Sequence, residues 1–147
     1  MVNAARILLI EDNEGDIFLL SMALKRASFS YDLTTIRDGA EAITYLMQCG
    51  MPGLAPPDLI VLDLNLPRVD GTSIIGLLRT EAALENIPVV VLSSSKSPED
   101  ARRAGGLKRS IFIAKPSELE AFMAIGEKVK DFLQQLRQTE SMSNAES

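Results

Sequence analysis

The sequence contains no histidine and only one cysteine. Without histidine there can be no Ser-His-Asp or Cys-His catalytic group, no histidine metal ligand and no histidine-based phosphocarrier. Any bound metal must therefore be a hard ion held by oxygen atoms. The single Cys49 excludes an internal disulfide, fits a reducing cytoplasm and is expected to be inert.

Long apolar runs and an excess of positive charge are missing as well. No run is long enough to cross a bilayer and no signal peptide is present, so we expect a cytoplasmic protein with no membrane partner. The chain carries 20 acidic against 15 basic residues, a net charge of -5, which argues against nucleic acid as a partner. Its 147 residues, 46% of them hydrophobic, suggest one domain.

Short apolar runs alternate with segments of helical periodicity. The runs cover residues 7–10, 59–62, 88–92 and 111–114, with a more polar run at 31–36. Strands that are apolar at every position belong to a parallel sheet that is buried on both faces, and the polar run predicts an edge strand. Five strand–helix units predict an α/β fold, doubly wound and flavodoxin-like rather than Rossmann-like.

Polar residues mark where the helices should begin. Helix starts are predicted at Asp38 with Glu41, at Ser97 with Pro98 and Asp100, and at Ser117 with Glu120. We expect further helices at about 16–26 and 72–84, and a last helix at about 118–137. Residues 5–137 then form the domain, and the polar tail 138–147 is expected to be disordered.

Chemically active side chains follow four of the predicted strands. They are Glu11, Asp12, Asp63, Ser93 and Lys115. Ligands of open α/β sheets bind beyond the carboxyl ends of the strands, so these side chains should converge. Carboxylates this close repel each other, and a hard divalent cation such as Mg²⁺ would offset the repulsion. The lysine marks a place for a further anion.

Four motifs, "IED", "LDLNLPRVDG", "VVVLSSS" and "IAKP", together resemble the receiver domain of two-component response regulators, over about residues 5–135. The resemblance implies strand order 2-1-3-4-5 and a phosphoryl group transferred to Asp63 from a sensor histidine kinase. It implies Mg²⁺ bound by Asp12, by Asp63, by the backbone carbonyl of Asn65 and, through water, by Glu11. It also implies that Lys115 pairs with a phosphoryl oxygen.

The same resemblance implies a conformational switch. Ser93 should turn toward the phosphoryl group, and Phe112 should change its burial at the face formed by the fourth helix, the fifth strand and the fifth helix. A cis peptide bond is expected between Lys115 and Pro116. The chain departs from the commoner pattern in having glutamate first in "IED", serine at 93 where threonine is frequent, and no hydroxyl on Phe112.

The segments "LLIEDNEGDIFLL", "PGLAPPDLIVLDLNLPRVDG" and "NIPVVVLSSS" resemble the small regulators paired with bacterial phytochromes and similar kinases. We therefore expect a single-domain response regulator, not an enzyme apart from an intrinsic autophosphatase activity. It would signal by contact with a downstream protein or through a phosphotransfer protein. One alternative is a degenerate receiver that acts only as a binding module. The other is a haloacid dehalogenase-like phosphatase, which normally has a second aspartate where this chain has Asn65.

Two surface features allow two interpretations each. The basic residues Arg102, Arg103, Lys108 and Arg109 are either a solvated surface or a docking patch. The apolar stripe of the last helix is wider than one sheet face needs. It is either packed within the chain or part of a weak homodimer interface on the side of the fourth helix and fifth strand.

Overall fold

The computed structural model describes residues 4–67, 71–94 and 98–146, without the side chains of Arg103 and residues 141–146. The elements are β1 (Ala5–Ile10), α1 (Glu14–Arg26), β2 (Tyr31–Ile36), α2 (Gly39–Gln48), β3 (Leu59–Asp63), α3 (Gly71–Thr80), β4 (Val89–Ser93), α4 (Pro98–Arg103), β5 (Ser110–Ala114), α5 (Leu119–Met123) and α6 (Ile125–Glu146). They fall into two units, one within residues 1–14 and 30–115, the other within 15–29 and 116–147. The expected cap at Ser97 lies outside the described residues.

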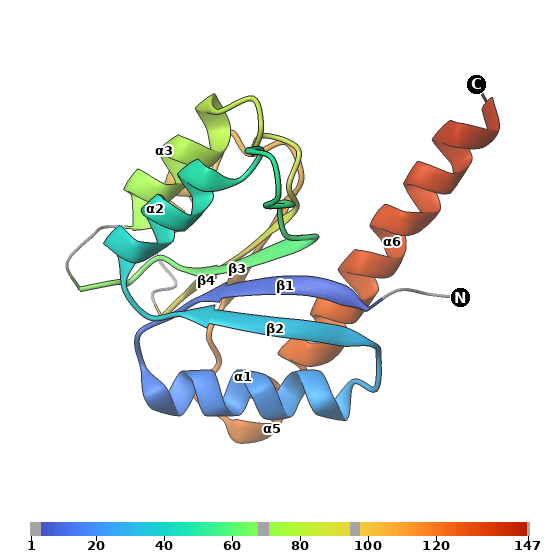
Figure 1. Cartoon of the computed structure of the whole chain (residues 1–147). Helices are drawn as coiled ribbons and strands as arrows, with labels where there is room; N and C mark the ends of the chain where they lie inside the picture. Colours follow the sequence, from blue (N-terminus) through green and yellow to red (C-terminus); the bar gives the residue numbers. More distant parts are fainter. Residues whose placement is uncertain (1–3, 68–70, 95–97, 147) are drawn as a thin grey trace. The chain divides into compact units, whose positions relative to one another are not determined.

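The first unit contains a parallel sheet of five strands in the order β2-β1-β3-β4-β5 (Figure 1). This order confirms the flavodoxin-like arrangement. β3 and β4, in the interior of the sheet, are buried at every position, as their continuous apolar runs predicted. β2 lies at one edge and is mostly partly buried or exposed, which confirms the edge strand predicted from its polar residues.

Helices α2 and α3 lie side by side over one face of this sheet (Figure 1). Their buried residues Ala42, Leu46, Ile74, Ile75 and Leu78 form one core with the sheet residues Leu8, Ile10, Ile60, Leu62, Val89 and Val91. Burying a leucine or isoleucine side chain contributes about 1.5–3 kcal/mol. Residues of the opposite parity, such as Leu9, Val61 and Val90, are buried as well. The strands thus have two apolar faces, and only their ends are available for polar chemistry.

The helix boundaries follow some of the predicted signals and not others. Asp38 caps α2 by accepting hydrogen bonds from the backbone N–H groups of Ala40 and Glu41, at 2.8 and 3.4 Å. The cap predicted at Ser117 is wrong, because the N-cap residue of α5 is Glu118, which makes no side-chain capping bond. α3 ends at Thr80 rather than near Leu84. Leu84 lies in a turn after the helix and is only 2% exposed, which explains why an apolar residue stands at this position.

The second unit contains α1, α5 and α6. A single last helix was predicted, but it is divided at Ala124 into α5 and α6. The predicted end near residue 137 is wrong, because α6 continues to Glu146. The disorder expected for the tail 138–147 stays a prediction. Phe132 is 8% exposed and Leu136 is partly buried, so much of the apolar stripe is packed within the chain. This packing reduces the surface on which the homodimer prediction rested.

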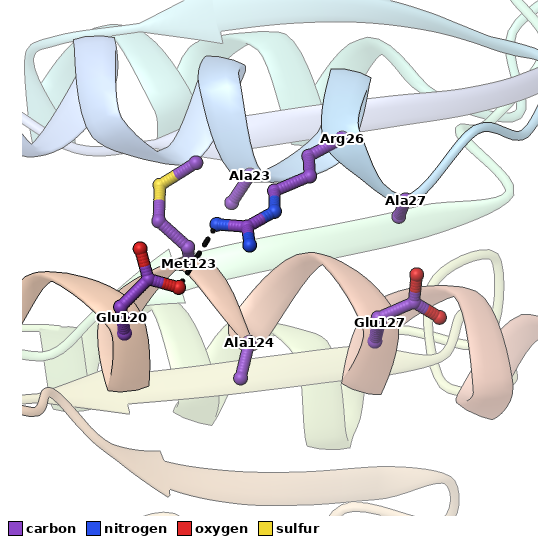
Figure 2. A pocket seen from close by; sticks show the side chains of 7 residues that line it. All are labelled: Ala23, Arg26, Ala27, Glu120, Met123, Ala124 and Glu127. Atoms are coloured by element: carbon purple, nitrogen blue, oxygen red, sulfur yellow. Dashed lines mark hydrogen bonds and ion pairs between the residues drawn. The ribbon is translucent and has the colours of Figure 1, made fainter.

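A surface cavity of about 300 Å³ lies in this second unit (Figure 2). It is lined by Ala23, Arg26, Ala27, Glu120, Met123, Ala124 and Glu127. An exposed ion pair joins Arg26 to Glu120 at 3.1 Å across it. None of the predicted site residues lines this cavity.

Two further expectations concern the peptide bond before Pro116 and membrane-spanning helices. No cis peptide bond occurs in the described residues, so the cis bond expected between Lys115 and Pro116 is wrong. The Lys115 side chain reaches the carboxylates of the first unit with a trans bond after it. No helix in the described part of the chain is both long and apolar enough to cross a membrane.

Candidate phosphorylation and metal site

The site lies where four neighbouring parallel strands end. β1 leads into Glu11 and Asp12, β3 ends in Asp63, β4 ends in Ser93, and β5 leads into Lys115. Because the strands are parallel, their carboxyl ends meet at one edge of the sheet. The local sequence thus changes from apolar to polar where each strand leaves the core, and the structure brings the predicted residues together.

Three carboxylates form the centre of the site. Glu11, Asp12 and Asp63 each place one oxygen within 4.8 Å of the other two. Glu11 is 0% exposed and Asp63 is 3% exposed, whereas Asp12 is partly exposed. A cluster of carboxylate oxygens with no nitrogen or sulfur donor fits a hard divalent cation such as Mg²⁺ or Mn²⁺.

Lys115 supplies the positive charge of the site. Its Nζ lies 2.9 Å from Oε2 of Glu11 and 3.3 Å from Oδ2 of Asp63, and its side chain is 10% exposed. With all groups ionised, three carboxylates and one ammonium leave two negative charges in this small volume. That residual charge matches one divalent cation. The donor set and its charge therefore both fit the metal expected from the sequence.

The protonation of Glu11 reflects the same excess of negative charge. Burial away from water raises the pKa of Glu11 from 4.5 to about 7, and the hydrogen bond and charge of Asp63 act in the same direction, whereas Lys115 lowers it. The metal-free protein therefore holds this carboxyl partly protonated near neutral pH. A cation bound among the carboxylates would favour the ionised form.

Hydrogen bonds hold the two loops beside Asp63 in place. The backbone N–H of Asn65 donates to Oδ1 of Asp63 at 2.9 Å. The side-chain Oδ1 of Asn65 accepts from the N–H of Ser94 at 3.0 Å and from its hydroxyl at 3.1 Å. The hydroxyl of Ser93 donates to Oδ2 of Asp100 at 2.7 Å. The loop after β3 is thus tied to the end of β4, and the end of β4 is tied to α4.

The proposed switch residue and the basic group lie on nearby elements of the first unit. Phe112, on β5, is partly buried and packs against the core shared by the sheet and α2 and α3. Lys108 pairs with Glu85 at 3.1 Å, so one of the basic residues is engaged with the loop before β4. Arg102 is exposed, and the side chain of Arg103 lies outside the described part of the chain.

Two residues near the site were missed by the sequence interpretation. Arg37 follows the edge strand β2, and its guanidinium pairs with Glu14 at 3.0 Å and reaches the backbone carbonyl of Asp12 at 3.5 Å. Its position directly after β2, like that of the site residues after the other strands, is the sequence signal that marks it. Asp100 was interpreted only as a first-turn acid of a helix. Its burial, at 7% exposure, is a tertiary property that no local pattern indicates.

Comparison with known proteins agrees with this geometry. Residues 7–126 match the response regulator receiver domain family. The chain is 35% identical over 126 residues to the probable methanogenesis regulatory protein FilR2 of Methanothrix harundinacea, covering 86% of this chain and 81% of that protein. It is 33% identical over 127 residues to the response regulator Rcp1 of Synechocystis, covering 86% of each.

Solved structures give the same result. The phosphorylated cyanobacterial phytochrome response regulator RcpA superposes with a TM-score of 0.79 at 36% identity, covering 89% of this chain and 94% of its own. The Mn²⁺-bound form of Rcp1 superposes with a TM-score of 0.77 at 32% identity, covering 87% and 93%. A divalent metal is thus held by a protein of this fold. On the family match and these similarities, the chain belongs to the response regulator receiver domain family and is a two-component signalling protein rather than a classical enzyme.

Proposed function

We propose that Asp63 accepts a phosphoryl group from the phosphohistidine of a sensor histidine kinase, in a reaction that requires Mg²⁺. The observation that carries this proposal is the position of the Asp63 carboxylate. It lies at the end of a central strand, with Glu11 and Asp12 within 4.8 Å and the Lys115 ammonium at 3.3 Å. The Lys115 ammonium, and a cation that the acids would hold, place positive charge beside the carboxylate nucleophile, which favours the charge distribution of phosphoryl transfer.

In this reaction a carboxylate oxygen of Asp63 forms a bond to phosphorus as the phosphorus–nitrogen bond breaks, and the electron pair of that bond stays on the imidazole. The product is an acyl phosphate. The N–H of Asn65 orients the Asp63 carboxylate, and Lys115 pairs with a phosphoryl oxygen. A cation bound by Asp12, by Asp63, by the carbonyl of Asn65 and, through water, by Glu11 would neutralise charge on the transferred group. The hydroxyl of Ser93 then donates a hydrogen bond to the phosphoryl group, and Phe112 changes its burial in response.

The two alternatives are less well supported. A dehalogenase-type phosphatase needs a general acid two residues after the nucleophile, and Asn65 at that position cannot transfer a proton in this way. A degenerate receiver would not need both Lys115 and the carboxylate cluster, yet these groups are in contact here. Intrinsic autophosphatase activity and a cytoplasmic location remain part of the proposal.

We infer that the phosphoryl donor is a kinase of the phytochrome type, because RcpA, at 36% identity, is a phytochrome response regulator. FilR2, at 35% identity, is a probable regulator of methanogenesis, so the pathway must be decided by experiment. Transfer rates measured against the sensor kinases of the same genome would identify the donor. The output we propose is contact with a downstream protein or a phosphotransfer protein, without nucleic acid, and with at most a weak homodimer.

The proposal is tested by incubating the chain with a small phosphoryl donor and Mg²⁺. Wild type should be labelled with a product that is labile in alkali, and chelation should abolish labelling. Asp63→Asn should remove the label but keep the fold, because asparagine retains an acceptor for the N–H of Asn65. Asp32→Asn is the matched control, since Asp32 is an exposed carboxylate on β2. Labelling of Asp63→Asn at the wild-type rate would refute the proposal.

A further inference from the structure

The hydroxyl of Ser93 is held by a carboxylate outside the metal cluster. Its Oγ lies 2.7 Å from Oδ2 of Asp100, in the first turn of α4, and 3.4 Å from Oδ1 of Asn65. Hydrogen bonds from a hydroxyl to a carboxylate are strongest at about 2.5–2.7 Å, so Asp100 is the preferred acceptor. Ser93 is 0% exposed and Asp100 is 7% exposed, which shields this bond from water.

A serine hydroxyl has only one proton to donate. In the proposed function, on which this inference rests, Ser93 donates that proton to the phosphoryl group on Asp63. Donation to Asp100 and donation to the phosphoryl group are therefore mutually exclusive. A stronger bond from Ser93 to Asp100 therefore lowers the population of the state in which Ser93 donates to the phosphoryl group, by the same factor.

We propose that Asp100 is a positioning residue that retains the Ser93 hydroxyl in the unphosphorylated protein and so opposes its turn toward Asp63. Ser93 must break a buried, charge-assisted hydrogen bond before it can turn toward Asp63. This cost lowers the population of the turned state by a factor on the order of tenfold. Because Asp100 is part of α4, the turn of Ser93 also changes how that helix is held to the end of β4. Phosphorylation is thereby coupled to α4 through one side chain.

A simpler role for Asp100 is to favour the first turn of α4 by its charge alone. Glu99 is in the same turn and also carries a negative charge, but it is exposed. A carboxylate that only offsets the helix dipole needs no hydrogen-bond partner on β4 and can act from an exposed position, as Glu99 can. Asp100 differs from Glu99 in being buried and in accepting the hydrogen bond of Ser93. Glu99 therefore provides a matched control for charge in the first turn.

The test measures how tightly the chain binds beryllofluoride, a phosphoryl analogue, by isothermal titration calorimetry at saturating Mg²⁺. Asp100→Ala should bind about tenfold more tightly than wild type. Asp100→Asn keeps the size and a neutral acceptor, so its effect should be smaller but in the same direction. Glu99→Gln should leave the affinity unchanged. Far-UV circular dichroism verifies that each variant is folded, and Asp100→Asn carries the test if the alanine variant is not.

The decisive measurement repeats the substitution in a Ser93→Ala background. Without the hydroxyl, Asp100→Ala should no longer change the affinity for beryllofluoride. Equal tightening in that background, tightening by Glu99→Gln, or no tightening by either Asp100 variant would overturn the role of Asp100. If wild type bound no beryllofluoride, or Asp63→Asn bound it equally well, the proposed function would fail instead. The two failures are therefore distinguishable.

Discussion

The buried carboxyl of Glu11 should make the stability of the metal-free protein depend on pH in an unusual direction. Its pKa is about 7 in the folded protein and 4.5 as an ordinary glutamate, because burial disfavours the charged form. A raised pKa means that the folded state holds the proton more tightly than the unfolded state. The stabilising contribution is therefore complete below about pH 4.5 and is lost as the pH rises through about 7.

The size of this effect follows from the interval between the two pKa values. One pKa unit corresponds to about 1.4 kcal/mol. The interval from 4.5 to about 7 therefore corresponds to about 3 kcal/mol of unfolding free energy. That is a large share of the about 5–15 kcal/mol that typically stabilises a domain. The substitution Glu11→Gln removes it, because glutamine has the shape of the protonated acid and does not titrate.

The assay is urea unfolding in a chelating buffer between pH 4.5 and 8. The chain has no tryptophan, so far-UV circular dichroism is the suitable signal. Relative to Glu11→Gln, wild type should lose about 3 kcal/mol across this range. Glu81→Gln, at an exposed position, is the control and should follow wild type. A constant difference between wild type and Glu11→Gln at every pH would refute the reasoning.

Adding Mg²⁺ tests the other half of the argument. A cation bound among Glu11, Asp12 and Asp63 favours their ionised forms, so it should restore stability at pH 8 and have little effect at pH 5. Equal stabilisation by Mg²⁺ at both values would contradict the assignment of this cluster as the metal site.

Three predictions concern the fold itself. Gly76, in the middle of α3, has no neighbouring atom within 4 Å of the place that a Cβ would take, so Gly76→Ala should raise the unfolding free energy by about 0.5–1 kcal/mol. A Cβ on Gly126 would lie 2.0 Å from the carbonyl oxygen of Ala23, so Gly126→Ala should lower the unfolding free energy by about 1–3 kcal/mol. Urea unfolding checks both, and a loss of stability on Gly76→Ala would contradict the first. Asp38→Ala removes the cap of α2 and should lower the unfolding free energy by about 1 kcal/mol, and an unchanged urea midpoint would contradict this.

Most of the site could be predicted because the first unit obeys a simple rule. Apart from the edge strand β2, its strands contain continuous apolar runs, so the first polar residue after each run marks the edge of the sheet. Ile10 is followed by Glu11, and Leu62 by Asp63, and these pairs lie on neighbouring strands. Strand order was implied by the resemblance rather than by periodicity, since an apolar run does not specify its neighbours.

Other features could not be predicted because they depend on tertiary contacts. The last helix is divided at Ala124, and the nearby Gly126 does not by itself predict a break, because a single glycine is tolerated inside a helix. Gly126 resembles any glycine in a helix, yet its lack of a side chain is what allows α6 to approach the backbone of Ala23 in α1. Asp100 has the sequence context of an ordinary first-turn acid, and only its burial beside Ser93 indicates another role.

Among the described residues, the buried polar or charged side chains are Glu11, Asp63, Ser93 and Asp100, and all belong to the first unit. Burying a carboxylate is unfavourable unless another group compensates it, and a well-packed apolar residue would cost less. Two side chains contribute to this compensation. Lys115 offsets part of the charge of Glu11 and Asp63, and Ser93 satisfies part of Asp100. A divalent cation would offset the remaining negative charge of Glu11 and Asp63, whereas the phosphoryl group would compete with Asp100 for the Ser93 hydroxyl. Metal binding should therefore stabilise the folded state, whereas any gain from the phosphoryl group is reduced by the loss of the Ser93–Asp100 bond. The unfolding free energy should thus report on metal occupancy independently of any downstream partner.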